Sequence, residues 1–244
     1  MQLDRELVIG KIAKSLESVD YVNALWLEGA DSLCAVDNYS DIDIWIDVKD
    51  GKENEVVDLI REILTSIGKL DFDFEKEHTH PKIRQHLFHI KDTPKFLLID
   101  VCVQSNSRVF WFTNGMEGEK VNILFDKKNV INFREMDNKA FEKDLSERKE
   151  YLTKQFILMR TDTEKEINRN DYLGALNFYL ELAITFTELL RIKYAPTKHE
   201  FGLKHSSKDL PDNLVDLLKQ VYSFKSIKDL EQNIDLMSKN ISLK

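Results

Sequence analysis

The strict alternation of residues 41–48 constrains the fold more than any other feature of this sequence. The segment reads DIDIWIDV, so a branched apolar residue stands at every second position and aspartate at most of the others. Because successive side chains of a β-strand point to opposite faces of the sheet, a period of two predicts a strand with one apolar face. We expect the isoleucines to pack against a helical layer and the aspartates to face the other way. Those aspartates are Asp41, Asp43 and Asp47.

A second segment, KFLLIDVCVQ at residues 95–104, has the same parity and carries Asp100 on its polar side. If the two strands are neighbours, Asp41, Asp43 and Asp100 converge on one open face. Carboxylates that crowd together stay ionised only when cations neutralise them, and Mg²⁺ prefers such oxygen ligands. Two such ions about 4 Å apart can clamp a phosphate and activate an attacking hydroxyl. The pattern therefore favours phosphoryl-type chemistry.

The remaining periodicities predict an α+β first half and an all-helical second half. The first half, residues 1–130, would be a mixed sheet with helices on one face, and the second, residues 136–244, a helical bundle. In the first half we expect helices at 3–19 and 53–68 and strands at 22–29, 41–48, 70–77, 82–90, 95–104 and 121–126. In the second half we expect helices at 137–160, 170–196, 211–222 and 226–240.

Charge is distributed unevenly along the chain and disfavours one class of partner. Residues 1–130 hold 24 acidic and 16 basic residues, whereas the rest of the chain holds 19 of each. Because recognition of a nucleic-acid backbone needs the opposite sign, broad nucleic-acid binding is disfavoured. We expect no membrane association, since no apolar run approaches the length of a span. Two cysteines, Cys34 and Cys102, form no disulfide framework, and a cytoplasmic location is expected.

One stretch, LEGADSLCAVDNYSDIDIWIDV, resembles the signature of the DNA polymerase beta-like nucleotidyltransferase superfamily. That signature is an apolar residue, a glycine, a glycine or serine and, about ten residues later, two aspartates that alternate with apolar residues, with a third aspartate on a later strand. Gly29 and Ala30 fill the first part, Asp41 and Asp43 the second, and Asp100 is the natural third aspartate. A helical domain after this core is similar to that of the antibiotic-modifying members, the aminoglycoside and lincosamide nucleotidyltransferases.

The resemblance implies a Mg²⁺-dependent nucleotidyltransferase, most simply an adenylyltransferase, that uses two metal ions. It would move a nucleoside monophosphate from ATP or another nucleoside triphosphate to a hydroxyl of a small acceptor and release pyrophosphate. An aminoglycoside-like antibiotic is one such acceptor. Asp41 and Asp43 would hold Mg²⁺, and Asp100 would share the second ion and act as a base. Gly29 would let the backbone approach the phosphates.

The chain departs from the family pattern where the phosphates would be held. Ala30 occupies the place of the usual serine, so the loop would grip phosphate through its backbone N–H groups, with a hydroxyl from Ser32 or Ser40. The stretch 195–211 is rich in lysine and histidine, and Lys198 or Lys204 would neutralise the triphosphate as a point charge. A solvated connector explains that stretch equally well.

Several alternatives stay open from the sequence. Ala30 also fits a catalytically inactive nucleotide-binding, regulatory or antitoxin-like protein, and a protein-modifying nucleotidyltransferase is a third hypothesis. Four histidines between residues 78 and 89 invite a zinc site, but His86 and His89 have opposite strand parity, which favours a polar hairpin. The protein could be a monomer or a homodimer.

Overall fold

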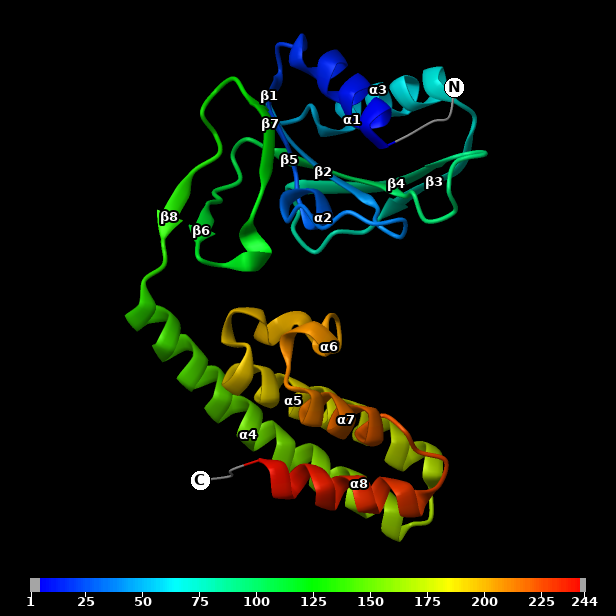
Figure 1. Cartoon of the computed structure of the whole chain (residues 1–244), viewed down its shortest axis with the longest axis vertical. Helices are drawn as coiled ribbons and strands as arrows, with labels where there is room; N and C mark the ends of the chain where they lie inside the picture. Colours follow the sequence, from blue (N-terminus) through cyan, green and yellow to red (C-terminus); the bar gives the residue numbers. More distant parts are fainter. Residues whose placement is uncertain (1–4, 242–244) are drawn as a thin grey trace. The chain divides into compact units, whose positions relative to one another are not determined.

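The computed structural model describes residues 5–241 and forms two compact units (Figure 1). The boundary between the units falls between Met136 and Asp137. The first unit is built on a sheet, whereas the second contains helices alone among its described residues. Because the first predicted helix, 3–19, begins among residues 1–4, its first two positions lie outside the described part of the chain.

The first unit is organised by a six-stranded mixed sheet in the order β3-β4-β5-β2-β1-β7. The central strands β2 and β5 are parallel, and every other pairing in this sheet is antiparallel. The strands are β1 (Val22–Leu27), β2 (Ile42–Val48), β3 (Leu70–Lys76), β4 (Ile83–Ile90), β5 (Ile99–Ser105) and β7 (Asn122–Asp126). The predicted α+β class, a mixed sheet followed by a helical region, is confirmed.

Two helices, α1 (Arg5–Glu17) and α3 (Glu53–Ile67), cover one face of this sheet (Figure 1). Helix α3 has apolar residues on one side and ends at Gly68, whose N–H bonds to the Leu64 carbonyl. The isoleucines of β2 pack beneath the helices in one continuous core, as the alternation predicts. They are Ile42, Ile44 and Ile46, all at most 1% exposed.

The opposite face of the sheet is covered only in part, by short elements too brief to show a sequence period. Trp26, Trp45, Phe110 and Phe112 build a small aromatic cluster there. The short elements are the one-turn helix α2 (Gly29–Ser32), the 3₁₀ turn η1 (Glu117–Glu119) and the parallel pair β6 (Phe112–Asn114) and β8 (Phe133–Glu135).

The second unit has its core around helix α5 (Tyr172–Tyr194), which packs along α4 (Asn138–Asn168). Asp137 and Asp171 cap the two helices by accepting N–H bonds from their first turns. By length and composition α5 could cross a membrane, contrary to the sequence expectation, but 56% of its apolar window is buried inside the protein. Such burial is typical of a core helix. The shorter elements are η2 (Pro196–Phe201), α6 (Ser206–Asp209), α7 (Asp212–Val221) and α8 (Ile227–Asn240).

Several predicted segments differ from the structure; the helix predicted at 137–160, for example, continues to Asn168 as α4. The strand predicted at 95–104 begins only at Ile99, because residues 94–98 form a turn in which Leu97 N–H bonds to the Pro94 carbonyl. Residues 195–211 contain a 3₁₀ turn and a short helix rather than an open connector. These turns are held by the guanidinium of Arg191, which is fully buried and donates to three backbone carbonyls.

Candidate functional site

Asp43 and Asp100 stand side by side on the open face of the sheet. Strands β2 and β5 are parallel neighbours, and their register pairs Asp43 directly with Asp100. Adjacent strands lie about 4.8 Å apart, so the two carboxylates share one small region. Asp41 precedes β2 and is exposed at the same end of the strand. The structure therefore brings Asp43 and Asp100 together, with Asp41 at the same end of the sheet.

Gly29 brings backbone against one of these carboxylates. Its φ is +60°, a conformation that residues with a Cβ rarely adopt, and a Cβ built there would lie 2.0 Å from Asp43 Oδ2. The preceding N–H, of Glu28, donates to the Asp43 carbonyl at 3.0 Å. The position therefore needs glycine twice over, once for its backbone angle and once for the space that Asp43 occupies.

Arg5 fixes the loop that joins Gly29 to Asp41. Its guanidinium pairs with Asp31, with Nε 2.9 Å from Oδ1, and donates to the carbonyls of Ser40, at 2.9 Å, and Asp41. Both partners of the ion pair are nearly buried, with side chains 12% and 7% exposed. Bonds from one guanidinium to several acceptors are geometrically specific, so helix α1 determines where Asp41 lies. Periodicity gave no sign of this residue, because its partners lie 26 to 36 positions away.

Asp100 is oriented by a neutral partner and is partly buried. Gln85 on β4 donates through Nε2 to both carboxylate oxygens, at 2.9 and 2.8 Å. Burial raises the pKa of Asp100, the Gln85 hydrogen bond and the charge of Lys76 oppose that rise, and the charge of Asp41 adds to it. The charge of Asp41 thus disfavours the ionised form of Asp100, a condition that a bound cation would relieve.

A further carboxylate, Glu28, lies beside Asp43 and was missed by the sequence reasoning. Burial raises its pKa to about 7, the Asp43 charge adds to the rise, and a hydrogen bond from Trp26 Nε1, at 3.0 Å, works against it. Arg108 is close enough to favour the charged form, and its guanidinium stacks over the rings of Trp45 and Phe110. The only available signal was its place directly before Gly29.

Two other polar side chains of this face are structural. Asp47 is fully buried and accepts hydrogen bonds from Asn23 and Gln104, both at 2.8 Å, and from Asn106 at 3.0 Å. It therefore belongs to a closed network and not to the exposed carboxylate group. Cys102 is buried beside the acids, and burial followed by the Asp100 charge raises the pKa of its thiol, so it stays protonated.

The hydroxyls predicted to bind phosphate make local hydrogen bonds. Ser32 Oγ donates to the Gly29 carbonyl at 2.9 Å, and Ser40 Oγ donates to Asp37 Oδ1 at 2.9 Å. In the helical unit, Lys198 Nζ donates to Asp209 Oδ1 at 2.8 Å, and the Lys204 carbonyl accepts from Arg191. Ala30 lies in α2 directly after Gly29. A role of these residues in nucleotide binding stays a prediction.

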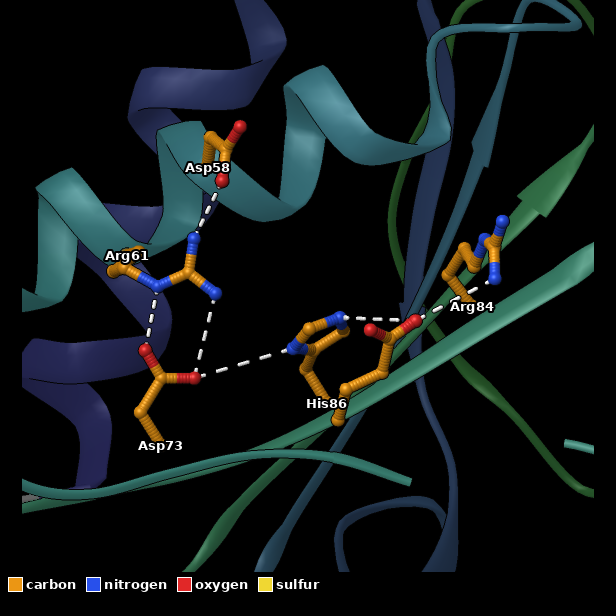
Figure 2. Close-up of polar contacts among 6 residues, drawn as sticks. Asp58, Arg61, Asp73, Arg84 and His86 are labelled. Carbon is orange, nitrogen blue, oxygen red and sulfur yellow. Dashed lines mark hydrogen bonds and ion pairs between the residues drawn. The ribbon is translucent and has the colours of Figure 1, made fainter. Parts of the chain in front are cut away.

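The histidines between residues 78 and 89 divide between two faces, as their parity predicts. His89 Nδ1 lies 2.6 Å from Asp71 Oδ1. His86 is 8% exposed and lies beneath α3, where it lines a cavity of about 380 Å³ with Arg61, Glu75 and Arg84 among others. Figure 2 shows its ring beside Asp73, which Arg61 also contacts. This cavity includes none of the three aspartates of the open face.

The donor set of the open face fits a hard divalent cation. Among the described residues, no three histidine, cysteine or acidic side chains converge closely enough to enclose a metal ion. The aspartates nevertheless supply only oxygen ligands, and two of them, Asp43 and Asp100, stand in register. Mg²⁺ commonly takes one or two protein carboxylates and completes its shell with water and substrate phosphates. Asp41, Asp43 and Asp100 are the residues that would hold it.

Comparison with known proteins gives structural likenesses only. No family model and no curated protein sequence matches the chain. A nucleotidyltransferase-like protein from Exiguobacterium sibiricum matches at 11% identity with a TM-score of 0.37, over 96% of this chain and 72% of the other. The GLD-2/RNP-8 complex matches at 12% identity and TM-score 0.32, over 92% of this chain and 61%, less than two thirds, of the other.

JHP933 from Helicobacter pylori matches at 13% identity with a TM-score of 0.29, over 98% of this chain and 94% of the other. All three TM-scores lie below 0.5, so the description of the site rests on its own geometry. The chain is an α+β protein in which a mixed sheet precedes a helical region.

Proposed function

We propose that the protein is a Mg²⁺-dependent nucleotidyltransferase that moves a nucleoside monophosphate, most simply AMP from ATP, to a hydroxyl of a small acceptor. The pairing of Asp43 with Asp100 on parallel strands, with the Gly29 backbone against Asp43, carries this proposal. Bound Mg²⁺ would neutralise the triphosphate and lower the pKa of an attacking hydroxyl.

The protein groups have separate tasks in this reaction. Asp41 and Asp43 would hold the cation against the triphosphate, and Arg5 would keep the Asp41 loop in place from outside the site. Asp100, with its raised pKa and its orientation fixed by Gln85, would accept the proton of the acceptor hydroxyl. The hydroxyl oxygen would then attack the α-phosphorus, and the bond to the departing pyrophosphate would break.

The charge of the first half of the chain suggests which class of acceptor it would bind. The excess of acidic residues in the first half of the chain, with Glu28 beside Asp43, favours a cationic acceptor such as an aminoglycoside-like antibiotic. A neutral polyol is the comparison to use, because it offers the hydroxyl without the charge.

The test combines binding with turnover. Mg²⁺-dependent binding of ATP is measured by calorimetry, and pyrophosphate release is followed with aminoglycosides and with neutral polyols. Asp41→Asn combined with Asp43→Asn is expected to abolish both. Asp216→Asn, an exposed change in the helical unit, is the matched control and is expected to change neither. Metal-dependent binding that survives the double change would show that the site lies elsewhere.

A catalytically inactive nucleotide-binding protein is the second candidate. Ala30 lacks the hydroxyl that the family this sequence resembles usually has at that position. The hydroxyls of Ser32 and Ser40 donate to acceptors within their own loop. Tight binding of Mg–ATP without pyrophosphate release for any acceptor would favour this candidate. Turnover that appears only in the Ala30→Ser variant would attribute the inactivity of the wild type to the missing hydroxyl.

A further inference from the structure

Two aromatic side chains are exposed on the loops that lead into the two carboxylate strands. Tyr39 is 72% exposed and Phe96 is 49% exposed. Their ring centroids are 5.3 Å apart with planes at 63°, an edge-to-face pair. Tyr39 stands two residues before Asp41, and Phe96 stands four residues before Asp100. Each ring therefore belongs to the loop that leads into one of the two carboxylate strands.

Hydrogen bonds hold the backbones of the two loops, so the points from which the rings project are defined. On the first loop, Tyr39 N–H donates to Asp37 Oδ1 at 2.9 Å, and Arg5 donates to the Ser40 carbonyl at 2.9 Å. The loops are joined where Ile42 N–H donates to the Leu98 carbonyl at 2.8 Å. Such preorganisation lowers the entropic cost of binding a ligand.

We infer that the Tyr39–Phe96 pair is the platform on which the base of the nucleoside triphosphate stacks. The inference rests on the proposed function, which places the triphosphate at Asp41 and Asp43. The nucleoside is bonded to the reacting α-phosphate, so its base lies close to the carboxylates and within range of the loops that precede them. Every nucleoside triphosphate presents a flat aromatic face, whereas a hydroxylated acceptor need not contain any ring.

The chemistry of the pair also predicts its selectivity. Stacking on an aromatic ring tolerates every base, because each base has a π-face, and it favours the larger purines. Phe96 offers no hydrogen-bonding group, and Tyr39 offers one hydroxyl. The platform therefore distinguishes a nucleotide from a bare polyphosphate more sharply than it distinguishes one base from another.

Calorimetry with two probes tests the platform. A nonhydrolysable ATP analogue and inorganic tripolyphosphate, both with Mg²⁺, are titrated into wild type and into Tyr39→Ala combined with Phe96→Ala. We expect the double variant to bind the ATP analogue about 10- to 100-fold more weakly and tripolyphosphate unchanged. Tyr39→Phe should retain affinity, because it keeps the ring. Phe133→Ala, a change of another half-exposed ring in the same unit, is the control.

The outcomes separate this inference from the proposed function. An unchanged affinity for the ATP analogue in the double variant, or an equal loss for both probes, overturns the platform and leaves the proposed function standing. An acceptor KM that rises while nucleotide binding is unchanged also overturns it, since the rings would then hold the acceptor. Wild-type protein that binds neither probe overturns the proposed function, and the platform with it. Circular dichroism confirms that the variants are folded.

Discussion

The two faces of the central sheet use the same strands for opposite purposes. On the helix-covered face, β2 contributes isoleucines to a core that excludes water. On the open face, the same strand and its neighbour β5 present Asp43 and Asp100, whose charges make the face costly to desolvate. Stability therefore comes from one face and chemistry from the other, and substitutions on the two faces should have separable effects.

The largest expected effect tests the helix-covered face. Ile44 is 1% exposed, so Ile44→Ala should reduce the free energy of unfolding by about 2–5 kcal/mol through lost burial and a cavity. Asp43→Asn, one residue away on the open face, should leave the free energy of unfolding unchanged or slightly increased. It should nevertheless remove metal-dependent nucleotide binding. Urea unfolding of both variants is the measurement. Equal destabilisation by the two changes would contradict the division between the faces.

Gly29 provides the second test, on the open face. Gly29→Ala would place a Cβ 2.0 Å from Asp43 Oδ2 at a φ of +60°, so the carboxylate or the loop must move. We expect pyrophosphate release to fall by at least about 100-fold, comparable to the loss of one preorganised catalytic contact. Gly10→Ala is the matched control, because a Cβ there meets nothing within 4 Å. A Gly29→Ala variant with full turnover would show that this approach of backbone to Asp43 is dispensable.

Glu28 gives a third effect, which depends on pH. Because its pKa is about 7 in the folded protein against 4.5 ordinarily, the folded state binds more protons between these values. The stability from Glu28 is therefore present below pH 4.5 and lost as the pH rises through 7. Glu28→Gln resembles the protonated form, so at pH 8 it should be about 1–2 kcal/mol more stable than wild type, and equally stable at pH 4.5. Urea midpoints at both pH values are compared, and a gain of equal size at both would exclude titration as its cause.

His86 gives the smallest effect and belongs to the helix-covered face. Burial lowers its pKa, although Glu75 and Asp73 oppose this from 3.8 and 4.0 Å. A lowered pKa means that its stability is present above pH 6.5 and lost as the pH falls through the folded value. Between pH 7.5 and 5.5 the free energy of unfolding should fall more in wild type than in His86→Phe. The difference between the two falls should be less than about 1 kcal/mol. Thermal unfolding at the two pH values measures this, and a steeper loss in His86→Phe would reverse the assignment.

The sequence predicted the central part of the fold because that part obeys local periods. The alternating pattern predicted β2 and the part of β5 that carries Asp100, and the helical period predicted α3 and α5. The pairing of Asp43 with Asp100 followed from parity once the strands were taken as neighbours. Short elements such as β6 and β8 escaped because three residues are too few to show a period.

The parts of the site that sequence reasoning missed all depend on contacts between distant residues. Gln85 reaches Asp100 across 15 positions and Arg5 reaches Asp41 across 36. Neither residue stands out in its own segment. The raised pKa of Glu28 likewise arises from burial among neighbouring strands, and Lys198 had no local sign of its partner Asp209. Folding alone brings these groups together.

The bonds that Arg5 makes across the first unit also bear on how the site opens. Helix α1 docks through a few buried residues, among them Ile12 and Leu16, and its first turn carries the guanidinium that holds Ser40 and Asp41. Local opening of that helix must release the loop at the same moment, because the two share this one side chain. Amide hydrogen exchange in α1 and in residues 31–41 should therefore rise and fall together. A ligand that slows amide exchange in this loop should also slow exchange in α1, although it does not contact that helix.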